Sequence, residues 1–256
     1  MESGLIMSAV RQNLRTPEAR STLLTDEIYA KIRELIMSYD ITPGSRINID
    51  ALSIKLKVSQ TPIREALARL ESEELIAKVP LKGYRATSLL SPKEFHDLFQ
   101  FRLLVEPWAA EQAAKLIDSK GIKAIKSEIS TTKKTLKIKN IDEFRSLTEH
   151  DSRFHALICE LSGNLSVSAA FARTHCHLHL FRLFIASRFK LIEDNSRSDF
   201  VQNLFEQYYQ NGAGQLAIVE HEVIAQAIIA RDTKAARLGM YAHIQSSLNR
   251  FSSREQ

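Results

Sequence analysis

The chain has 256 residues, of which 44% are hydrophobic and 25% are charged, and its formal net charge is +5. This composition is typical of a soluble globular protein with one or two domains. It argues against a membrane protein, because no apolar run approaches the roughly 20 residues of a membrane-spanning helix. The 2 cysteines are too few for a disulfide framework, and with no secretory signal we expect a cytoplasmic protein.

Turn-forming residues are scarce, with 8 glycines and 6 prolines in the whole chain. We therefore expect a mainly α fold, in which helices are joined by short loops. The positive net charge permits a nucleic-acid partner but does not demonstrate one.

The N-terminal third of the chain predicts a winged helix-turn-helix domain behind a tail. Residues 1–22 show no sustained periodicity, so we expect a flexible tail there and the domain over residues 23–89. Apolar residues then recur at helical spacing from Leu24 to about Ser38, and a Pro-Gly pair turns the chain. A short helix is expected to follow Asp50, which would serve as its N-cap.

The stretch VSQTPIREALARL predicts the second helix of the turn motif. Ser59 or Thr61 is expected as its N-cap, and Pro62 falls in the first turn, where its missing N–H costs nothing. The predicted buried stripe consists of Ile63, Ala66, Leu67 and Leu70. Two β-prone runs follow, residues 75–79 and 84–88, and they flank a tip that contains a glycine, which predicts a hairpin. Helices, turn and hairpin together predict the winged helix-turn-helix.

The exposed start of this second helix carries side chains suited to reading DNA. A recognition helix lays its first residues, here Gln60, Thr61 and Arg64, against base edges in the major groove. Arg64 suits guanine and Gln60 suits adenine, while Lys82 and Gly83 at the hairpin tip can approach phosphate. The alternative is a protein-docking adaptor, which would bind no DNA at any salt concentration.

The segment PGSRINIDALSIKLKVSQTPIREALARLESEELI resembles the winged-helix signature of the GntR family of bacterial transcription regulators. The resemblance covers roughly residues 24–88 and includes the pattern Leu-x-x-x-Leu-x-Val-Ser-x-Thr-Pro-x-Arg-Glu-Ala-Leu and the glycine of the wing. It implies a homodimer that binds a palindromic operator in double-stranded DNA. It also implies DNA contacts from Thr61, Arg64 and Gly83.

Two positions depart from the family pattern. Gln60 stands where the family commonly has arginine, and Asp50 lies where some members have another basic DNA-contacting residue. The resemblance therefore implies a changed operator preference from Gln60, and the DNA contact that some members make at the position of Asp50 does not carry over.

A second domain is predicted over residues 90–256. It begins at the capping box SPKE, with Ser91 as the cap, Pro92 at the first helical position and Glu94 three residues after the cap. From there the pattern predicts only helices. The expected breaks lie near residues 118–121, 140–142, 163–164, 194–198, 211–214 and 231–232. Because no period of 20–50 residues repeats, we expect a helical bundle rather than a solenoid.

Four side chains of this domain are expected to meet in its interior. Asp151 and His155 are four residues apart on one helix face, beside apolar neighbours. His221 and His243 lie at nearly equal distances on either side of the helix joint at 231–232, so an antiparallel hairpin brings them to one level. One carboxylate and three imidazoles suit a divalent transition metal such as Zn, Ni or Mn.

Two alternatives to a regulatory metal site stay open at this point. Each histidine alone is better interpreted as a core or surface side chain hydrogen-bonded to a helix neighbour. A metal-dependent enzyme built on the same four residues is the other alternative, although no motif for a general base or nucleophile accompanies them.

Residues 92–252 resemble the FCD-type ligand domain that accompanies this winged helix in the FadR-like branch of the family. The landmarks are FRLLVEPWAAEQAA, DSRFHALICELSGN and EHEVIAQAIIARDTKAARLGMYAHI. In metal-binding members the equivalent aspartate and three histidines are the ligands, which implies Asp151, His155, His221 and His243. The resemblance also implies a small carboxylate effector bound beside the metal, and hence a ligand-responsive repressor or activator.

The effector pocket is expected to draw on two further segments. The resemblance suggests Arg102 as the anion anchor, with an ion pair to Glu106 one turn later as the alternative. The stretch THCHLHLF is expected inside one long helix over residues 165–188, and its neighbourhood supplies the other predicted effector contacts. These contacts are His177, His179 and Arg182. The connection over residues 190–215 is longer than the family pattern.

Overall fold

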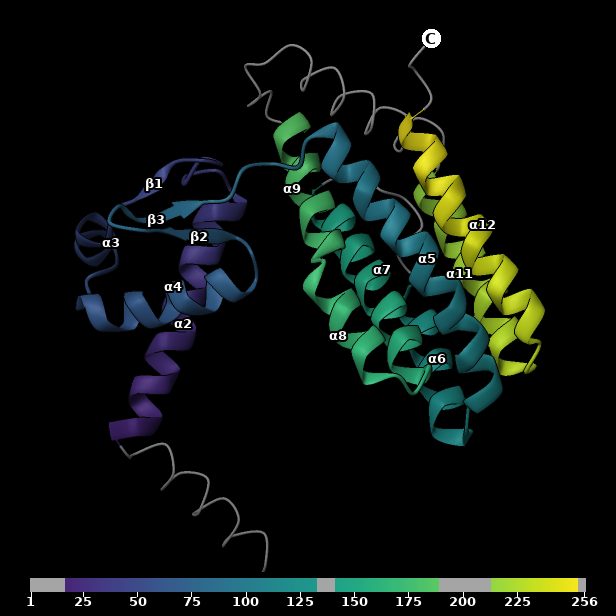
Figure 1. The fold of residues 1–256 in the computed structure, drawn as a ribbon. Helices are drawn as coiled ribbons and strands as arrows, with labels where there is room; N and C mark the ends of the chain where they lie inside the picture. Colours follow the sequence, from purple (N-terminus) through teal and green to yellow (C-terminus); the bar gives the residue numbers. More distant parts are fainter. Residues whose placement is uncertain (1–16, 133–140, 189–212, 253–256) are drawn as a thin grey trace, which may run out of the picture. The chain divides into compact units, whose positions relative to one another are not determined.

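The computed structural model describes residues 17–132, 141–188 and 213–252. The chain divides into two compact units, Met1–Leu89 and Leu90–Gln256, which are described separately (Figure 1). The predicted mainly α class is confirmed, and the one sheet in the described residues is small. Residues 1–16 of the predicted tail lie outside the described residues, but the first helix begins at Pro17, earlier than expected.

The N-terminal unit is a three-helix core with a small three-stranded sheet. Its elements are α2 (Pro17–Met37), β1 (Arg46–Ile47), α3 (Ile49–Leu56), α4 (Gln60–Ser72), β2 (Ile76–Val79) and β3 (Gly83–Ala86). The predicted stripe of α4 is fully buried, with Ile63, Ala66, Leu67 and Leu70 each at 0% exposure. It packs on α2, whose Ile28, Ile32 and Ile36 are also buried. This packing fixes which face of α4 stays exposed.

The cap of α3 differs from the expectation. Asn48, not Asp50, is the N-cap, and its side-chain oxygen accepts hydrogen bonds from the backbone N–H groups of Asp50 and Ala51. Asp50 lies in the first turn instead, where its side chain is exposed and free to contact α4. For α4 the predicted cap position Ser59 is confirmed, although its side chain makes no capping hydrogen bond.

The predicted hairpin is present, with β2 and β3 antiparallel and Val79 opposite Gly83. Gly83 has a φ of 83°, a conformation that L residues with a side chain rarely adopt, which explains the glycine at the tip. A third strand, β1, pairs with the other edge of β3, and the sequence did not predict it. At two residues it is too short to show a period.

The C-terminal unit is a bundle of helices packed around α5. The helices are α5 (Pro92–Leu116), α6 (Ser119–Thr132), α7 (Ile141–Leu161), α8 (Leu165–Arg173), α9 (Cys176–Arg188), α11 (Ala213–Ile229) and α12 (Thr233–Ser252). The capping box at Ser91 is confirmed, with Glu94 bonded back to the Ser91 backbone. Helix α5 packs against α7, α11 and α12, so the inner faces of these helices surround one interior (Figure 1).

The prediction of one long helix over residues 165–188 is wrong. Helix α8 ends at Arg173 and α9 begins at Cys176, with a break at His175, whose φ is 43°. No glycine or proline marks this break, so no local residue pattern indicated it. Because of the break, the histidines that follow it do not face as they would in one continuous helix. Both His177 and His179 are buried.

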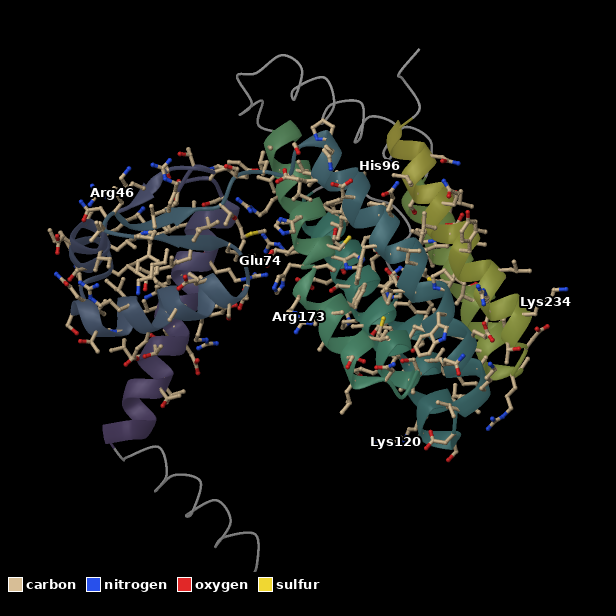
Figure 2. All side chains as sticks on the ribbon, viewed as in Figure 1. Arg46, Glu74, His96, Lys120, Arg173 and Lys234 are labelled. Carbon is tan, nitrogen blue, oxygen red and sulfur yellow. The ribbon has the colours of Figure 1, made fainter. Side chains whose placement is uncertain are left out.

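Charged side chains such as Lys120 and Lys234 lie at the surface of the C-terminal unit (Figure 2). None of the helices in the described ranges is long and apolar enough to cross a membrane. The long connection noted at 190–215 lies almost entirely outside the described residues.

Candidate metal centre and DNA-contacting helix

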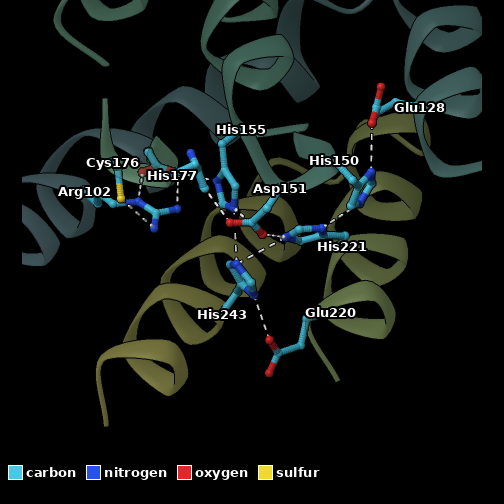
Figure 3. A network of polar contacts seen from close by, with 11 residues as sticks. Arg102, Glu128, His150, Asp151, His155, Cys176, His177, Glu220, His221 and His243 are labelled. Carbon is cyan, nitrogen blue, oxygen red and sulfur yellow. Dashed lines mark hydrogen bonds and ion pairs between the residues drawn. The ribbon is translucent and has the colours of Figure 1, made fainter. Parts of the chain in front are cut away.

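Four predicted ligands from three helices meet inside the C-terminal unit. Asp151 and His155 come from α7, His221 from α11 and His243 from α12, and one ligand atom from each lies within 4.8 Å of all the others. The three imidazoles are buried, at 3% exposure or less. The antiparallel pairing of α11 and α12 places the Nε2 atoms of His221 and His243 3.3 Å apart (Figure 3).

Two of the histidines have their outer nitrogen fixed by a carboxylate. His155 Nδ1 contacts Glu106, and His243 Nδ1 lies 2.7 Å from Glu220 Oε2. A carboxylate only accepts hydrogen bonds, so in each ring Nδ1 carries the proton and Nε2 keeps its lone pair. Both lone pairs therefore point toward the centre of the cluster. This carboxylate–histidine arrangement is the usual outer support of a metal-bound imidazole.

The inner nitrogens face one another without a proton between them. The Nε2 atoms of His155 and His243 are 3.2 Å apart, and His221 Nε2 lies 3.2 Å from Asp151 Oδ1. Burial lowers the pKa of His155 to about 3 and also lowers the pKa of His243, so neither ring carries a second proton at neutral pH. Converging lone pairs and a carboxylate repel one another unless a cation lies among them, so the donor set fits a divalent metal.

Asp151 is held from a second side by a histidine outside the predicted ligand set. His177 Nε2 lies 2.6 Å from Asp151 Oδ2, while the other carboxylate oxygen faces His221. Burial acts to raise the pKa of Asp151, but His177, His221 and other nearby histidines outweigh it. The pKa of the carboxyl is therefore well below its ordinary value. Asp151 is an anion at neutral pH, as a metal ligand must be.

Arg102 makes the ion pair that was the alternative to an effector anchor. Its Nε lies 2.5 Å from Glu106 Oε1, and both side chains are almost completely buried. Burial acts to raise the pKa of Glu106, but Arg102 and His155 outweigh it and hold the pKa below its ordinary range. A second guanidinium nitrogen lies 3.6 Å from the sulfur of Cys176. Glu106 thus contacts both Arg102 and the candidate metal ligand His155.

A pocket adjoins the candidate metal centre. Its cavity volume is about 30 Å³, and it is partly open to solvent. Its polar wall contains Arg102, Thr148, Asp151, His243 and Ser247, which include two of the four candidate ligands. Its apolar wall is formed by Phe99, Phe144, Leu147, Leu180 and Ala217. The pocket therefore presents both polar and apolar side chains, the mixed lining that is common in sites for small organic ligands.

The predicted effector residues are placed differently from one another. Among the described residues, Arg102 lines this pocket, while His177 contacts Asp151 instead. His179 and Arg182 are buried in α9, and burial together with Arg182 lowers the pKa of His179 to about 4. Neither is among the lining residues that the structure describes.

In the N-terminal unit, the start of α4 presents the predicted DNA contacts on an exposed face. Gln60, Thr61 and Arg64 are all exposed, as are Lys82 and Gly83 at the hairpin tip. An Arg64 nitrogen donates to Gln60 Oε1 at 3.1 Å. The exposed face matches the arrangement in which a recognition helix enters the major groove.

The two departures from the family pattern contact each other. Gln60 Nε2 donates to Asp50 Oδ1 at 2.5 Å, so both ends of the Gln60 amide are engaged. Reading adenine requires both the oxygen and the nitrogen of that amide. Each end of the amide keeps one unused donor or acceptor site, so the two hydrogen bonds orient Gln60 without preventing an adenine contact.

Four site residues were missed by sequence reasoning or given another role. Glu106 was considered only as the partner of Arg102, and the others were not singled out. They are Glu128, His150 and Glu220. Adjacency was the available signal, since His150 precedes Asp151 and Glu220 precedes His221, but adjacent helix residues rarely face one site.

Two family models match the chain. The model for bacterial regulatory proteins of the gntR family matches residues 24–85, and the FCD domain model matches residues 97–246. Together they span both units, and the FCD match alone covers more than half of the chain.

Similar proteins carry regulatory names. The chain is 25% identical over 220 residues to an HTH-type transcriptional regulator in an unstable DNA locus of Streptomyces ambofaciens, covering 86% of this chain and 81% of that protein. It is 25% identical over 241 residues to the Uxu operon regulator of Haemophilus influenzae, covering 87% and 81%. The crystal structure of a putative transcriptional regulator GntR from Rhodococcus sp. RHA1 superposes with a TM-score of 0.60 at 15% identity, covering 91% and 99%. This likeness concerns the fold alone.

Proposed function

The chain belongs to the GntR family of bacterial regulatory proteins and carries an FCD domain, and from this premise we propose a transcription regulator whose operator binding responds to a metal-coordinated organic acid. Regulation of transcription through DNA binding is the activity of this family, which is not a family of enzymes. The observation that carries the finer proposal is the convergence of three imidazoles and one carboxylate beside a pocket.

Asp151, His155, His221 and His243 would hold the metal, and Zn, Ni or Mn suits this set of nitrogen and oxygen donors. When bound, the metal supplies a positive charge that attracts a carboxylate. The chain's own residues prepare this site: Glu106 and Glu220 orient two imidazoles, and His177 holds the aspartate.

The effector is proposed to be a small organic acid in the adjoining pocket. Its carboxylate would face the wall with Asp151 and His243, next to the metal, with Arg102 close by. The rest of the molecule would contact apolar lining residues such as Phe99 and Phe144. The Haemophilus influenzae relative is named as the regulator of an operon, and the apolar lining residues favour an acid with a hydrophobic part.

DNA is proposed to be read by the N-terminal unit, as a homodimer on a palindromic operator in the cytoplasm. Arg64 would contact bases, and Lys82 and Gly83 would contact phosphate, because they lie exposed on α4 and the hairpin tip. The acid would change operator affinity only through unequal affinity for the DNA-bound and free states, so DNA would change the affinity for the acid by the same factor.

The test is operator binding by the full chain in three states: metal-stripped, metal-loaded, and metal-loaded with candidate acids. The probe is a duplex selected by the protein from a random-sequence library, and affinity is measured by fluorescence anisotropy. We expect specific, salt-sensitive binding that at least one acid shifts only when metal is present. Operator binding indifferent to metal and to every acid tested would refute the effector part of the proposal.

A further inference from the structure

The third ligand histidine has a different outer partner from the other two. His221 Nδ1 faces an imidazole, with His150 Nε2 at 3.1 Å, whereas His155 and His243 face carboxylates. His150 lies on α7, one residue before Asp151, and is only 2% exposed. It is therefore buried against the candidate metal centre without being one of its ligands.

The other nitrogen of His150 reaches α6. His150 Nδ1 lies 2.8 Å from Glu128 Oε1, and Glu128 also accepts from Arg153 Nε, with distances of 3.2 and 3.1 Å to its two oxygens. Figure 3 shows Glu128, His150 and His221 in a row that ends at the candidate metal centre. The Glu128 side chain is 14% exposed and that of Arg153 is 52% exposed, so the row runs from near the surface to the interior.

The direction of each hydrogen bond in this row follows from the group at its outer end, the Glu128 carboxylate. The Glu128 carboxylate can only accept, so His150 Nδ1 must donate to it. A neutral ring with a proton on Nδ1 has a lone pair on Nε2. That lone pair accepts from His221 Nδ1–H. His221 is then left with its own lone pair on Nε2, directed at His243 and Asp151.

Packing fixes the plane of the same ring. Phe154 stacks on His221 with ring centroids 4.2 Å apart and an interplanar angle of 20°, and Phe154 is fully buried. Stacking alone leaves the ring free to flip by 180° about its Cβ–Cγ bond, because the flipped ring lies in the same plane. The hydrogen bond from Nδ1 to His150 removes that freedom, because only one orientation places Nε2 at the centre.

We propose that His150 and Glu128 are positioning residues for the metal, a relay that sets the tautomer and orientation of His221 in place of a direct carboxylate. The proposal rests on the proposed metal centre and adds two residues outside its ligand set. It also makes α6, which supplies no ligand, part of the metal site. Outer partners of this kind typically change metal affinity by about 10- to 100-fold when removed.

The test compares the zinc affinity of metal-stripped full-length variants by competition with a chromophoric chelator. His150→Phe keeps an aromatic ring but removes both nitrogens, and we expect binding about 10- to 100-fold weaker. His150→Gln is the rescue, because its amide oxygen can accept from His221 and its amide nitrogen can donate to Glu128, and we expect most of the affinity to return. Glu149→Gln is the matched control, because Glu149 is an exposed residue of the same helix, and unchanged affinity is expected.

A nitrogen NMR experiment reads the relay directly. We expect His221 to carry its proton on Nδ1 in metal-free wild type and in His150→Gln, and to become a mixture of tautomers in His150→Phe. Glu128→Ala provides a second variant at a partly exposed position if His150→Phe does not fold. Weakened zinc binding in Glu128→Ala is the expected result.

The zinc measurements distinguish a failure of the proposed metal centre from a failure of the proposed relay. If wild type binds zinc no better than Asp151→Asn does, the proposed metal centre is wrong and the relay falls with it. If wild type binds zinc tightly and the folded relay variants bind it within about twofold of wild type, the metal centre stands and the relay is refuted.

Discussion

Glu106 is a buried carboxylate that contacts two other buried side chains of the C-terminal unit. Replacing it with a neutral residue tests how much its charge stabilises this unit. The residue is 0% exposed, pairs with Arg102 and accepts a hydrogen bond from His155. Glu106→Gln keeps the shape and an acceptor oxygen for His155, but leaves the Arg102 guanidinium without its counter-charge. Breaking a buried ion pair in this way costs about 3 to 5 kcal/mol.

The assay is urea denaturation of the metal-free chain, followed by the fluorescence of Trp108, the only tryptophan, on α5. The expected loss corresponds to a fall in the melting temperature on the order of 10 °C for a unit of this size. Glu111→Gln is the matched control, because Glu111 lies on the same helix and pairs with Lys115 four residues later at the surface. We expect little change there, since exposed ion pairs stabilise weakly.

A double variant separates charge from packing. Arg102→Met combined with Glu106→Gln removes both charges and keeps the acceptor for His155, so we expect it to recover part of the lost stability. The reasoning is refuted if Glu106→Gln unfolds at the same urea concentration as Glu111→Gln, or if the double variant is no more stable than Glu106→Gln alone.

Three further predictions concern DNA recognition and pH. Arg64→Ala is expected to weaken binding to a selected operator by about 1 to 3 kcal/mol, mostly at one base pair, and unchanged affinity would rule out α4 as the reading helix. Asp50→Ala frees the Gln60 amide, so the selected operator sequence should change near that contact; an identical selected sequence would contradict this role. His155 and His179 have pKa values lowered by burial to about 3 and about 4, below the ordinary 6.5. Their stabilising contribution is complete above pH 6.5 and is lost as the pH falls toward those values, so the metal-free unit should lose about 1 kcal/mol per pH unit for each histidine. Equal unfolding free energies at pH 7 and pH 5 would contradict this predicted pH dependence.

Several helix boundaries and the convergence of the four candidate ligands were predictable from local patterns. The buried stripe of α4, the capping box at Ser91 and the joint at 231–232 all follow from side-chain spacing and cap chemistry, and the structure has each of them. The convergence of His221 with His243 follows from counting residues on either side of that joint.

What the sequence did not predict depends on tertiary contacts. The break at His175 has no glycine or proline, and it places His177 against Asp151 rather than in the pocket wall. The supports of the ligands come from other helices, with Glu106 on α5 and Glu128 on α6, so no local spacing connects them to the histidines. The bond between Asp50 and Gln60 likewise joins two helices.

The most direct test of the account is the transition-metal content of the full-length protein, measured by elemental analysis after dialysis against equal Zn, Ni and Mn. His221→Asn, which removes one predicted ligand, is measured beside it. The account predicts about one metal ion per wild-type chain and a large loss in the variant. Equal metal content in the two proteins, or none in either, would contradict it.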